Sequence, residues 1–88
     1  MALVPWVYLL RCRDGSLYAG AAIELERRMK EHHAGTASRY TRSRLPVELV
    51  WWTEVETWSA ALREERRIKA LRRVEKEQLV TLQGACRR

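Results

Sequence analysis

Polar side chains fall on helical positions of this chain where the periodicity predicts apolar ones. In the helical segment that follows Thr57, a rotation of about 100° per residue places Glu65 within about 40° of Ala61 and close to Ile68. A carboxylate on that apolar stripe costs several kcal/mol of desolvation unless a cation pairs with it. Two interpretations follow: a core glutamate held by an arginine, or a carboxylate that binds a metal or takes part in catalysis.

An earlier helical segment, Ile23–His33, shows the same anomaly. Measured from Leu25, Arg28 and His32 fall on the rim or interior of the packing face, whereas Arg27 faces solvent. A single histidine on an apolar face is usually a satisfied core residue. An arginine, a histidine and a glutamate that all point inward in 88 residues favour a functional site.

Two tyrosines, Tyr8 and Tyr18, lie on the strands of a predicted hairpin over 6–12 and 17–21. A two-residue turn at Asp14-Gly15 joins them. That turn predicts three cross-strand pairs: Arg13 with Ser16, Arg11 with Tyr18, and Tyr8 with Ala21. The pattern leaves open whether the tyrosines share a face, and ordinary strand packing with hydroxyls at the sheet edge is the alternative.

The elements that must position these side chains follow the order β-β-α-β-α-α. After the hairpin we expect a helix over Ile23–His33 ended by Gly35, a strand over Val47–Glu54, a helix from Thr57 or Ser59 to about Leu71, and a helix over Val74–Gln83 ended by Gly84. This order predicts a small α/β domain with helices packed on the sheet. We expect one domain over 1–84 and a flexible tail over 85–88.

The charge balance indicates an anionic partner. Lys and Arg total 17 against 11 Asp and Glu, a net charge of +6, and 14 of the 17 cations are arginine. Guanidinium groups suit phosphate oxygens, so nucleic acid is the first candidate, although a generic surface from a GC-rich genome, in which codon bias replaces Lys by Arg, would give the same composition. The segment Thr36–Pro46 holds Arg39, Arg42 and Arg44 without an acidic residue and is predicted to be a basic loop.

The composition also excludes several classes of protein. Hydrophobic residues make up 47% and charged residues 32% of the chain, which is typical of a globular domain. No apolar run reaches the roughly 18–20 residues that cross a bilayer, so we expect no membrane association. Cys12 and Cys86 have no metal-site spacing, which favours a reducing, cytoplasmic location.

The motif residues taken together resemble the GIY-YIG nuclease superfamily. Val7-Tyr8-Leu9 and Tyr18-Ala19-Gly20 are similar to its paired motif, and both keep the tyrosine. Further similar stretches cover nearly the whole chain: Leu25–His32, Arg39–Arg42, Pro46–Val50 and Ala61–Leu71. The closest resemblance is to a short bacterial branch made of this domain alone. It implies a three-stranded antiparallel sheet flanked by helices.

The resemblance also implies a function, namely hydrolysis of DNA phosphodiester bonds by a divalent-metal-dependent endonuclease. It implies that Tyr8, Tyr18, Arg28 and His32 are catalytic and that Glu65 binds the metal, Mg²⁺ or Mn²⁺, with no small-molecule cofactor. Which tyrosine is the base stays open. The residues expected to contact DNA are Arg39, Arg42, Arg44 and Lys69.

Two alternatives stand beside the nuclease. The chain could be a nucleic-acid-binding module that has lost catalysis, which predicts salt-dependent binding without turnover. It could also be an interaction domain that docks on a partner protein through Trp51, Trp52 or Trp58. Strand and helix packing is the ordinary explanation of those tryptophans.

Overall fold

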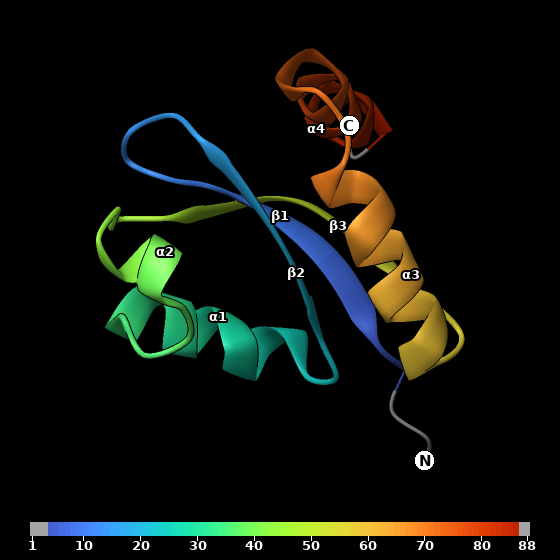
Figure 1. The fold of residues 1–88 in the computed structure, drawn as a ribbon, viewed down its shortest axis with the longest axis horizontal. Coiled ribbons are helices and arrows are strands. Elements are labelled where there is room, and N and C mark those ends of the chain that lie inside the picture. Colours follow the sequence, from blue (N-terminus) through green and yellow to red (C-terminus); the bar gives the residue numbers. More distant parts are fainter. Residues whose placement is uncertain (1–3, 87–88) are drawn as a thin grey trace.

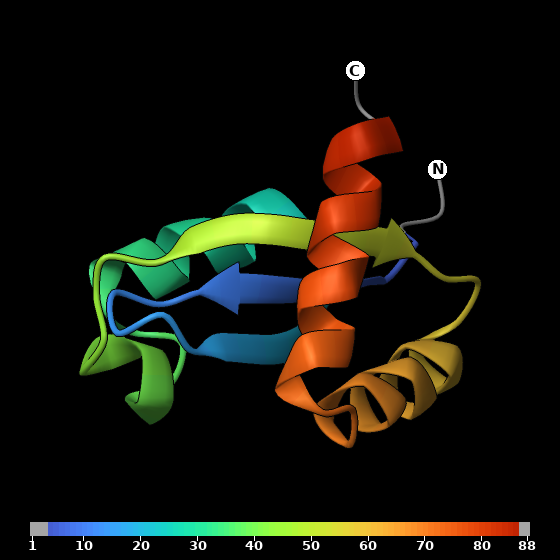
Figure 2. The ribbon, with the colours of Figure 1, turned by 90° about the horizontal axis from the view of Figure 1, so that it is seen from above.

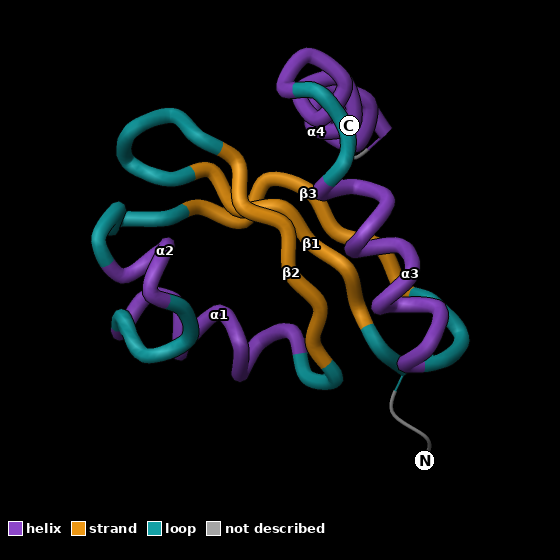
Figure 3. Tube along the Cα trace, viewed as in Figure 1, coloured by secondary structure: helices purple, strands orange, loops and turns teal. Residues whose placement is uncertain are grey.

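The computed structural model describes residues 4–86, with side chains as far as Gln83. Its centre is a three-stranded antiparallel sheet in the order β2-β1-β3. The strands are β1 (Trp6–Arg11), β2 (Leu17–Ala22) and β3 (Glu48–Glu54). Figure 3 shows the three strands side by side at the centre of the molecule. The predicted fold class and element order are confirmed.

Four helices cover the sheet. They are α1 (Leu25–Ala34), α2 (Arg39–Arg42), α3 (Trp58–Lys69) and α4 (Arg73–Cys86). In Figure 1, α1 and α2 lie on one side of the sheet and α3 and α4 on the other. Among the described residues, 4–86, no helix is long and apolar enough to cross a membrane.

Two predicted helix limits and one predicted loop are wrong. Helix α1 begins at Leu25, because Glu24 has an extended backbone with φ −118° and ψ 101°. Helix α4 continues through Gly84 to Cys86, because a glycine inside a helix costs only about 1 kcal/mol and need not end it. The basic segment 36–46 is not entirely a loop, since Ser38 caps the single turn of α2. Residues 87–88 of the expected tail lie outside the described range.

The hairpin turn has three loop residues and not two. The backbone N–H of Gly15 donates to the carbonyl of Cys12 at 2.9 Å, and the N–H of Cys12 donates to the carbonyl of Ser16 at 2.9 Å. Gly15 has φ 86°, a left-handed conformation that closes a three-residue hairpin loop as a bulge. The Asp14-Gly15 pair therefore marks the turn, but it sets a different register from the predicted one.

This turn moves the register of β2 by one residue. Tyr8 lies opposite Gly20, and Leu10 lies opposite Tyr18. Because side chains alternate between faces, a shift of one residue moves all of them to the other face. The predicted pairs would have placed the tyrosines on opposite faces. The observed pairs place Tyr8 and Tyr18 on the same face, the one covered by α1.

Each face of the sheet has its own core. The face toward α1 and α2 buries Tyr8, Leu10, Cys12, Ala22, Met29 and Val47. The face toward α3 and α4 buries Val7, Leu9, Ala19, Ala61 and Ile68. The central strand β1 therefore alternates strictly between the two cores. This alternation determines which side chains of β1 face each core, and it directs Tyr8 to the face covered by α1.

Helix α4 is attached to the far side of the sheet. Arg11 forms two hydrogen bonds with the carboxylate of Glu77, at 2.9 and 2.6 Å. The side-chain amide of Gln83 accepts from the backbone N–H of Trp52 at 2.8 Å and donates to its carbonyl at 2.5 Å. Figure 2 shows α4 lying across β3. The helix thus satisfies backbone groups at the open edge of β3, which would otherwise be free to pair with another chain.

Candidate nuclease site

A buried chain of hydrogen bonds joins β1, α1 and α2. The hydroxyl of Tyr8 lies 2.8 Å from Nε2 of His32, and Nδ1 of His32 lies 3.0 Å from Oγ1 of Thr41. The Thr41 hydroxyl donates onward to the carbonyl of Ser38 at 3.4 Å. Its oxygen therefore accepts the proton of Nδ1, which leaves Nε2 as the acceptor for the Tyr8 hydroxyl.

The protonation states of this chain follow from its burial. His32 is 0% exposed. Burial, and next the charge of Arg28, lowers its pKa to about 4, so the imidazole is neutral at pH 7. Burial also raises the pKa of Tyr8, and the charge of Tyr18 adds to the rise, while Arg28 opposes it. In the free protein Tyr8 therefore keeps its proton and donates it to the imidazole.

Gly20 makes room for this tyrosine. A Cβ at position 20 would lie 2.5 Å from Cζ of Tyr8 and 2.9 Å from its Cε2, closer than real side chains approach. The ring of Tyr8 thus crosses the backbone of the neighbouring strand directly over Gly20. The close approach of the ring therefore requires glycine at position 20, because the backbone there lies within a strand and makes no turn.

Tyr18 also contacts the imidazole. Its ring meets His32 edge-on, with centroids 5.6 Å apart, and stacks on Tyr40 of α2 with centroids 5.7 Å apart and an interplanar angle of 24°. The Tyr40 hydroxyl donates to Ser16 Oγ at 2.8 Å, and the guanidinium of Arg44 lies 3.8 Å above the Tyr40 ring. Through Tyr40, helix α2 therefore holds Tyr18 beside His32.

Arg28 projects toward the two buried groups. Its charge lowers the pKa of both Tyr8 and His32, which places it within electrostatic reach of each. Its side chain is 39% exposed and pairs with Glu31 at 3.3 Å. Arg27 is 75% exposed and lies 3.9 Å from the same carboxylate. The helical phase therefore distinguishes the inward arginine from the outward one correctly.

Glu65 lies on α3 and acts on Tyr8 through its charge. Its carboxylate is 22% exposed and pairs with Lys69 at 3.5 Å. Its charge contributes to the raised pKa of Tyr8, although α3 packs on the opposite face of the sheet. Among the described residues its ion-pair partner is this lysine and no arginine, so the pairing cation differs from the one that the core interpretation expected. The neighbouring Glu64 is taken by Arg67, whose Nε donates to it at 2.6 Å.

The donor set at Glu65 suits a strongly hydrated cation. Within the described part of the chain, no cluster of three or more His, Cys, Asp or Glu side chains could hold a metal. One half-buried carboxylate suits Mg²⁺, which keeps several water ligands and takes further oxygens from substrate phosphates. A metal that needs three or four protein ligands, such as structural zinc, does not fit.

The four cations expected to contact DNA differ in their surroundings. Arg39 and Arg42 on α2 are exposed, and neither belongs to an ion pair among the described residues. Arg44 donates to Asp14 at 3.0 Å and also lies on the Tyr40 ring, so it is committed within the protein. Lys69 is occupied by Glu65. The accessible basic surface beside the site is therefore α2.

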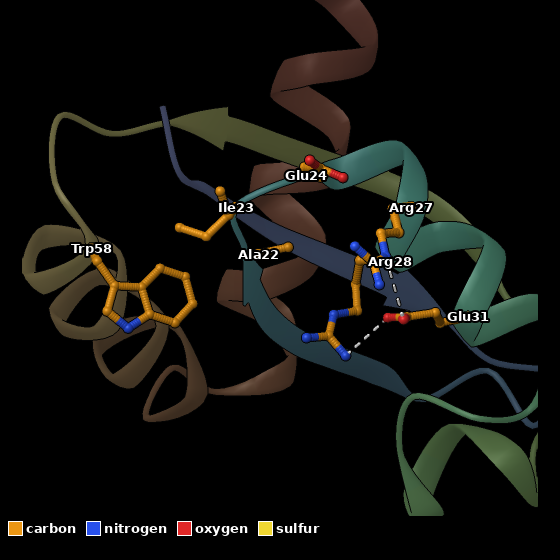
Figure 4. Close-up of a pocket in the computed structure, with 7 residues that line it drawn as sticks. All are labelled: Ala22, Ile23, Glu24, Arg27, Arg28, Glu31 and Trp58. Carbon is orange, nitrogen blue, oxygen red and sulfur yellow. Dashed lines mark ion pairs between the residues drawn. The ribbon is translucent and has the colours of Figure 1, made fainter. Parts of the chain in front are cut away.

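A pocket opens beside Arg28, at the edge of the sheet between α1 and α3. Its volume is about 500 Å³. It is lined by Ala22, Ile23, Glu24, Arg27, Arg28, Glu31 and Trp58. In Figure 4 the indole of Trp58 stands on one side of this space, and the α1 side chains stand on the other. Trp51 and Trp52 are different, since they pack against the two cores of the sheet.

The fold, a three-stranded antiparallel sheet flanked by helices, is shared with solved structures of a small α/β family. A family profile described as the GIY-YIG catalytic domain matches residues 4–78. The chain belongs to the GIY-YIG family, and its relatives are UPF0213 proteins, a small single-domain group within that family. Membership indicates a nuclease-type function with DNA as the substrate, and GIY-YIG nucleases generally depend on a divalent metal.

Relatives match over almost their whole length. A UPF0213 protein of Natronomonas pharaonis is 48% identical over 80 residues, which cover 91% of this chain and 94% of the relative. The solution NMR structure of a UPF0213 protein from Bacillus halodurans is 42% identical and superposes with a TM-score of 0.60 over 92% of this chain and 86% of that one. A solution NMR structure from E. faecalis gives 38% identity and a TM-score of 0.61, over 93% and 88% of the two chains.

Two residues that contact the site have no role in the sequence analysis. Thr41 is fully buried and orients His32, and Tyr40 stacks on Tyr18. Both lie in the Arg39–Arg42 stretch that supports the family resemblance. The sequence does contain an indication of this short helix, because Ser38, three residues before Thr41, is a typical helix N-cap.

Proposed function

We propose that this protein is a divalent-metal-dependent endonuclease that hydrolyses DNA phosphodiester bonds. The observation that carries the proposal is the buried Tyr8–His32–Thr41 chain, with the charges of Arg28 and Glu65 both acting on Tyr8. This chain places a buried phenol within hydrogen-bond distance of a neutral imidazole, an arrangement that can pass a proton. Family membership supports the same chemistry.

Tyr8 and His32 together act as the proton acceptor. A water that loses its proton to the Tyr8 oxygen can do so while the Tyr8 proton passes to Nε2 of His32. The tautomer with the proton on Nδ1 leaves Nε2 free for this step. The low pKa of His32 and the raised pKa of Tyr8 keep this transfer inactive in the free protein.

Bound substrate and metal change that balance. When bound, a divalent cation polarises the phosphate and stabilises the departing oxygen. Glu65 would hold it with one carboxylate, and the phosphate would supply further oxygens. Arg28 adds a fixed positive charge where negative charge develops, and it also lowers the pKa of Tyr8. Tyr18 packs against His32 and directs a second hydroxyl to the same face.

DNA reaches the site over helix α2. The exposed Arg39 and Arg42 are adjacent to Tyr40 and Thr41, which contact the site directly. The net charge of +6 supports the approach of a polyanion.

Nicking of supercoiled DNA in the presence of Mg²⁺ tests the proposal. We expect the wild type to convert supercoiled plasmid to open circles, and Arg28→Ala to lose about 100-fold or more of this activity. Arg27→Ala is the matched control and keeps most of it. Equal activity of the two variants, or nicking that persists in EDTA, would contradict the proposal.

A further inference from the structure

The pocket between α1 and α3 shares Arg28 with the chemistry proposed above, but its other lining residues have no part in it. Two of its lining residues, Arg28 and Glu31, also act on the pKa of Tyr8. In Figure 4 the guanidinium of Arg28 points into the space between α1 and Trp58. A substrate whose phosphate meets Arg28 therefore has its next group at this pocket.

Trp58 is an unusual residue to leave on the surface. It is 42% exposed although it is the largest side chain of the pocket. Trp58 and Glu65 are seven residues apart on α3, so they lie on the same side of the helix and about 10 Å apart along its axis. The pocket and the carboxylate assigned to the metal are thus served by the same side of α3.

The lining suits a flat aromatic group attached to an anion. The indole offers an apolar face for stacking, and Ile23 and Ala22 are the apolar side chains beside it. Arg27 and Arg28, which both pair with Glu31, can turn to a bound anion, and Glu24 supplies a carboxylate that can accept hydrogen bonds from amino groups. Four of the seven lining residues are charged, which does not suit an apolar partner helix.

We propose that this pocket binds an unpaired nucleobase next to the scissile phosphate, stacked on Trp58. The inference rests on the proposed function and names its substrate class, which is DNA with a single-stranded nucleotide at the point of cleavage. A base inside an intact duplex is already stacked and paired, and its extrusion costs a few kcal/mol. Single-stranded and branched DNA therefore bind in preference to duplex of the same sequence.

Binding in EDTA separates this proposal from the nuclease activity. The affinity of a short fluorescent oligonucleotide, single-stranded or in duplex, is measured by anisotropy for the wild type and for Trp58→Ala. Stacking on an aromatic side chain is worth about 1–3 kcal/mol per base, so the variant should bind single strands about 5- to 150-fold more weakly. Its affinity for the duplex should change less than about twofold.

Matched variants assign the effect to the pocket. Trp58→Phe should keep most of the single-strand affinity, and Leu62→Ala should keep all of it, because Leu62 is 41% exposed on the same helix but does not line the pocket. Wild type should also lose affinity when one nucleotide of the single strand is made abasic, and this arm does not depend on the folding of a variant.

Three outcomes would overturn the inference: wild-type binding equal for single strands and duplex, an equal loss of both in Trp58→Ala, or unchanged affinity in that variant. Glu65→Gln keeps the single-strand preference if the inference is right, even though it removes cleavage. If the wild type prefers single strands but does not cleave DNA, the proposed nuclease function has failed. If it cleaves DNA without that preference, the inference about the pocket has failed.

Discussion

Acidification should destabilise this protein through a single buried histidine. Burial, and next Arg28, lowers the pKa of His32 from 6.5 to about 4 in the folded state. The unfolded chain therefore binds more protons than the folded chain between these two values. Because the folded-state pKa is the depressed one, this stability is complete above pH 6.5 and is lost as the pH falls toward 4.

The size of the effect follows from the two pKa values. Linkage gives a loss of about 2 kcal/mol in the free energy of unfolding between about pH 7.5 and pH 5, and about 3 kcal/mol once the pH is below 4. Carboxylates add to the loss at the acid end, since the pKa values of Glu77 and Glu75 lie below their usual range. Measurements above about pH 5 thus isolate the histidine.

Urea unfolding at a series of pH values, followed by tryptophan fluorescence, measures this slope. The variant His32→Gln removes the titrating imidazole and should have a nearly flat profile above about pH 5. The variant His33→Gln, which changes the exposed neighbour, should keep the wild-type slope. A wild-type loss below about 0.5 kcal/mol, or the same slope in both variants, would refute the buried neutral imidazole.

Three further predictions concern the supports of the site. Gly20→Ala should lower the free energy of unfolding by about 1–3 kcal/mol, because the new Cβ displaces the ring of Tyr8. Thr41→Val should cost about 1–3 kcal/mol, because it leaves the imidazole N–H buried without a partner, whereas Thr41→Ser keeps the bond. Replacing Arg39 and Arg42 by glutamine should reduce the slope of log affinity for DNA against log salt concentration by about 2.

Simple measurements check each of these. Thermal or urea unfolding tests the Gly20 and Thr41 predictions. If Gly20→Ala leaves the stability unchanged, the ring of Tyr8 does not cross β2 at that position. If Thr41→Val and Thr41→Ser are equally stable, the hydroxyl of Thr41 does not stabilise the imidazole. Binding titrations at several salt concentrations decide the third, for which Arg44→Gln is the control, since that guanidinium is held by Asp14.

Arg28, His32 and Glu65 could be singled out from the sequence, because the angular position of a residue on a helix depends only on its spacing from nearby residues. Arg28 and His32 stand on the inner side of α1, and Glu65 stands on α3 beside buried Ala61 and Ile68, as a rotation of 100° per residue requires. Eleven of the twelve expected limits of the strands and longer helices lie within two residues of the observed ones, and the exception is the end of α4. The roles of these side chains in catalysis stay predictions.

The shared face of the tyrosines could not be predicted, because it depends on the length of one turn. Asp14-Gly15 is compatible with loops of two or three residues, and only the left-handed Gly15 and its bonds to Cys12 and Ser16 decide between them. One residue of difference reverses the face of every side chain on β2.

The engagement of Arg44 and the supporting role of α2 come from tertiary contacts. Arg44 reaches Asp14, which is 30 residues earlier in the chain, and Tyr40 reaches Ser16 and Tyr18 on the hairpin. No local pattern in a basic segment indicates which arginine turns back toward the protein. The contacts of Arg44 within the protein could therefore not be predicted from its position in the sequence.

The most direct test of the account is a Mg²⁺ titration of DNA cleavage by three proteins: wild type, Glu65→Gln and Glu64→Gln. The account predicts that Glu65→Gln loses at least about 100-fold of the activity at every Mg²⁺ concentration, because the metal supplies several kcal/mol of charge stabilisation. It predicts that Glu64→Gln, whose carboxylate is paired with Arg67, follows the wild-type curve. Indistinguishable curves for the two variants, or full cleavage by Glu65→Gln, would contradict the central claim.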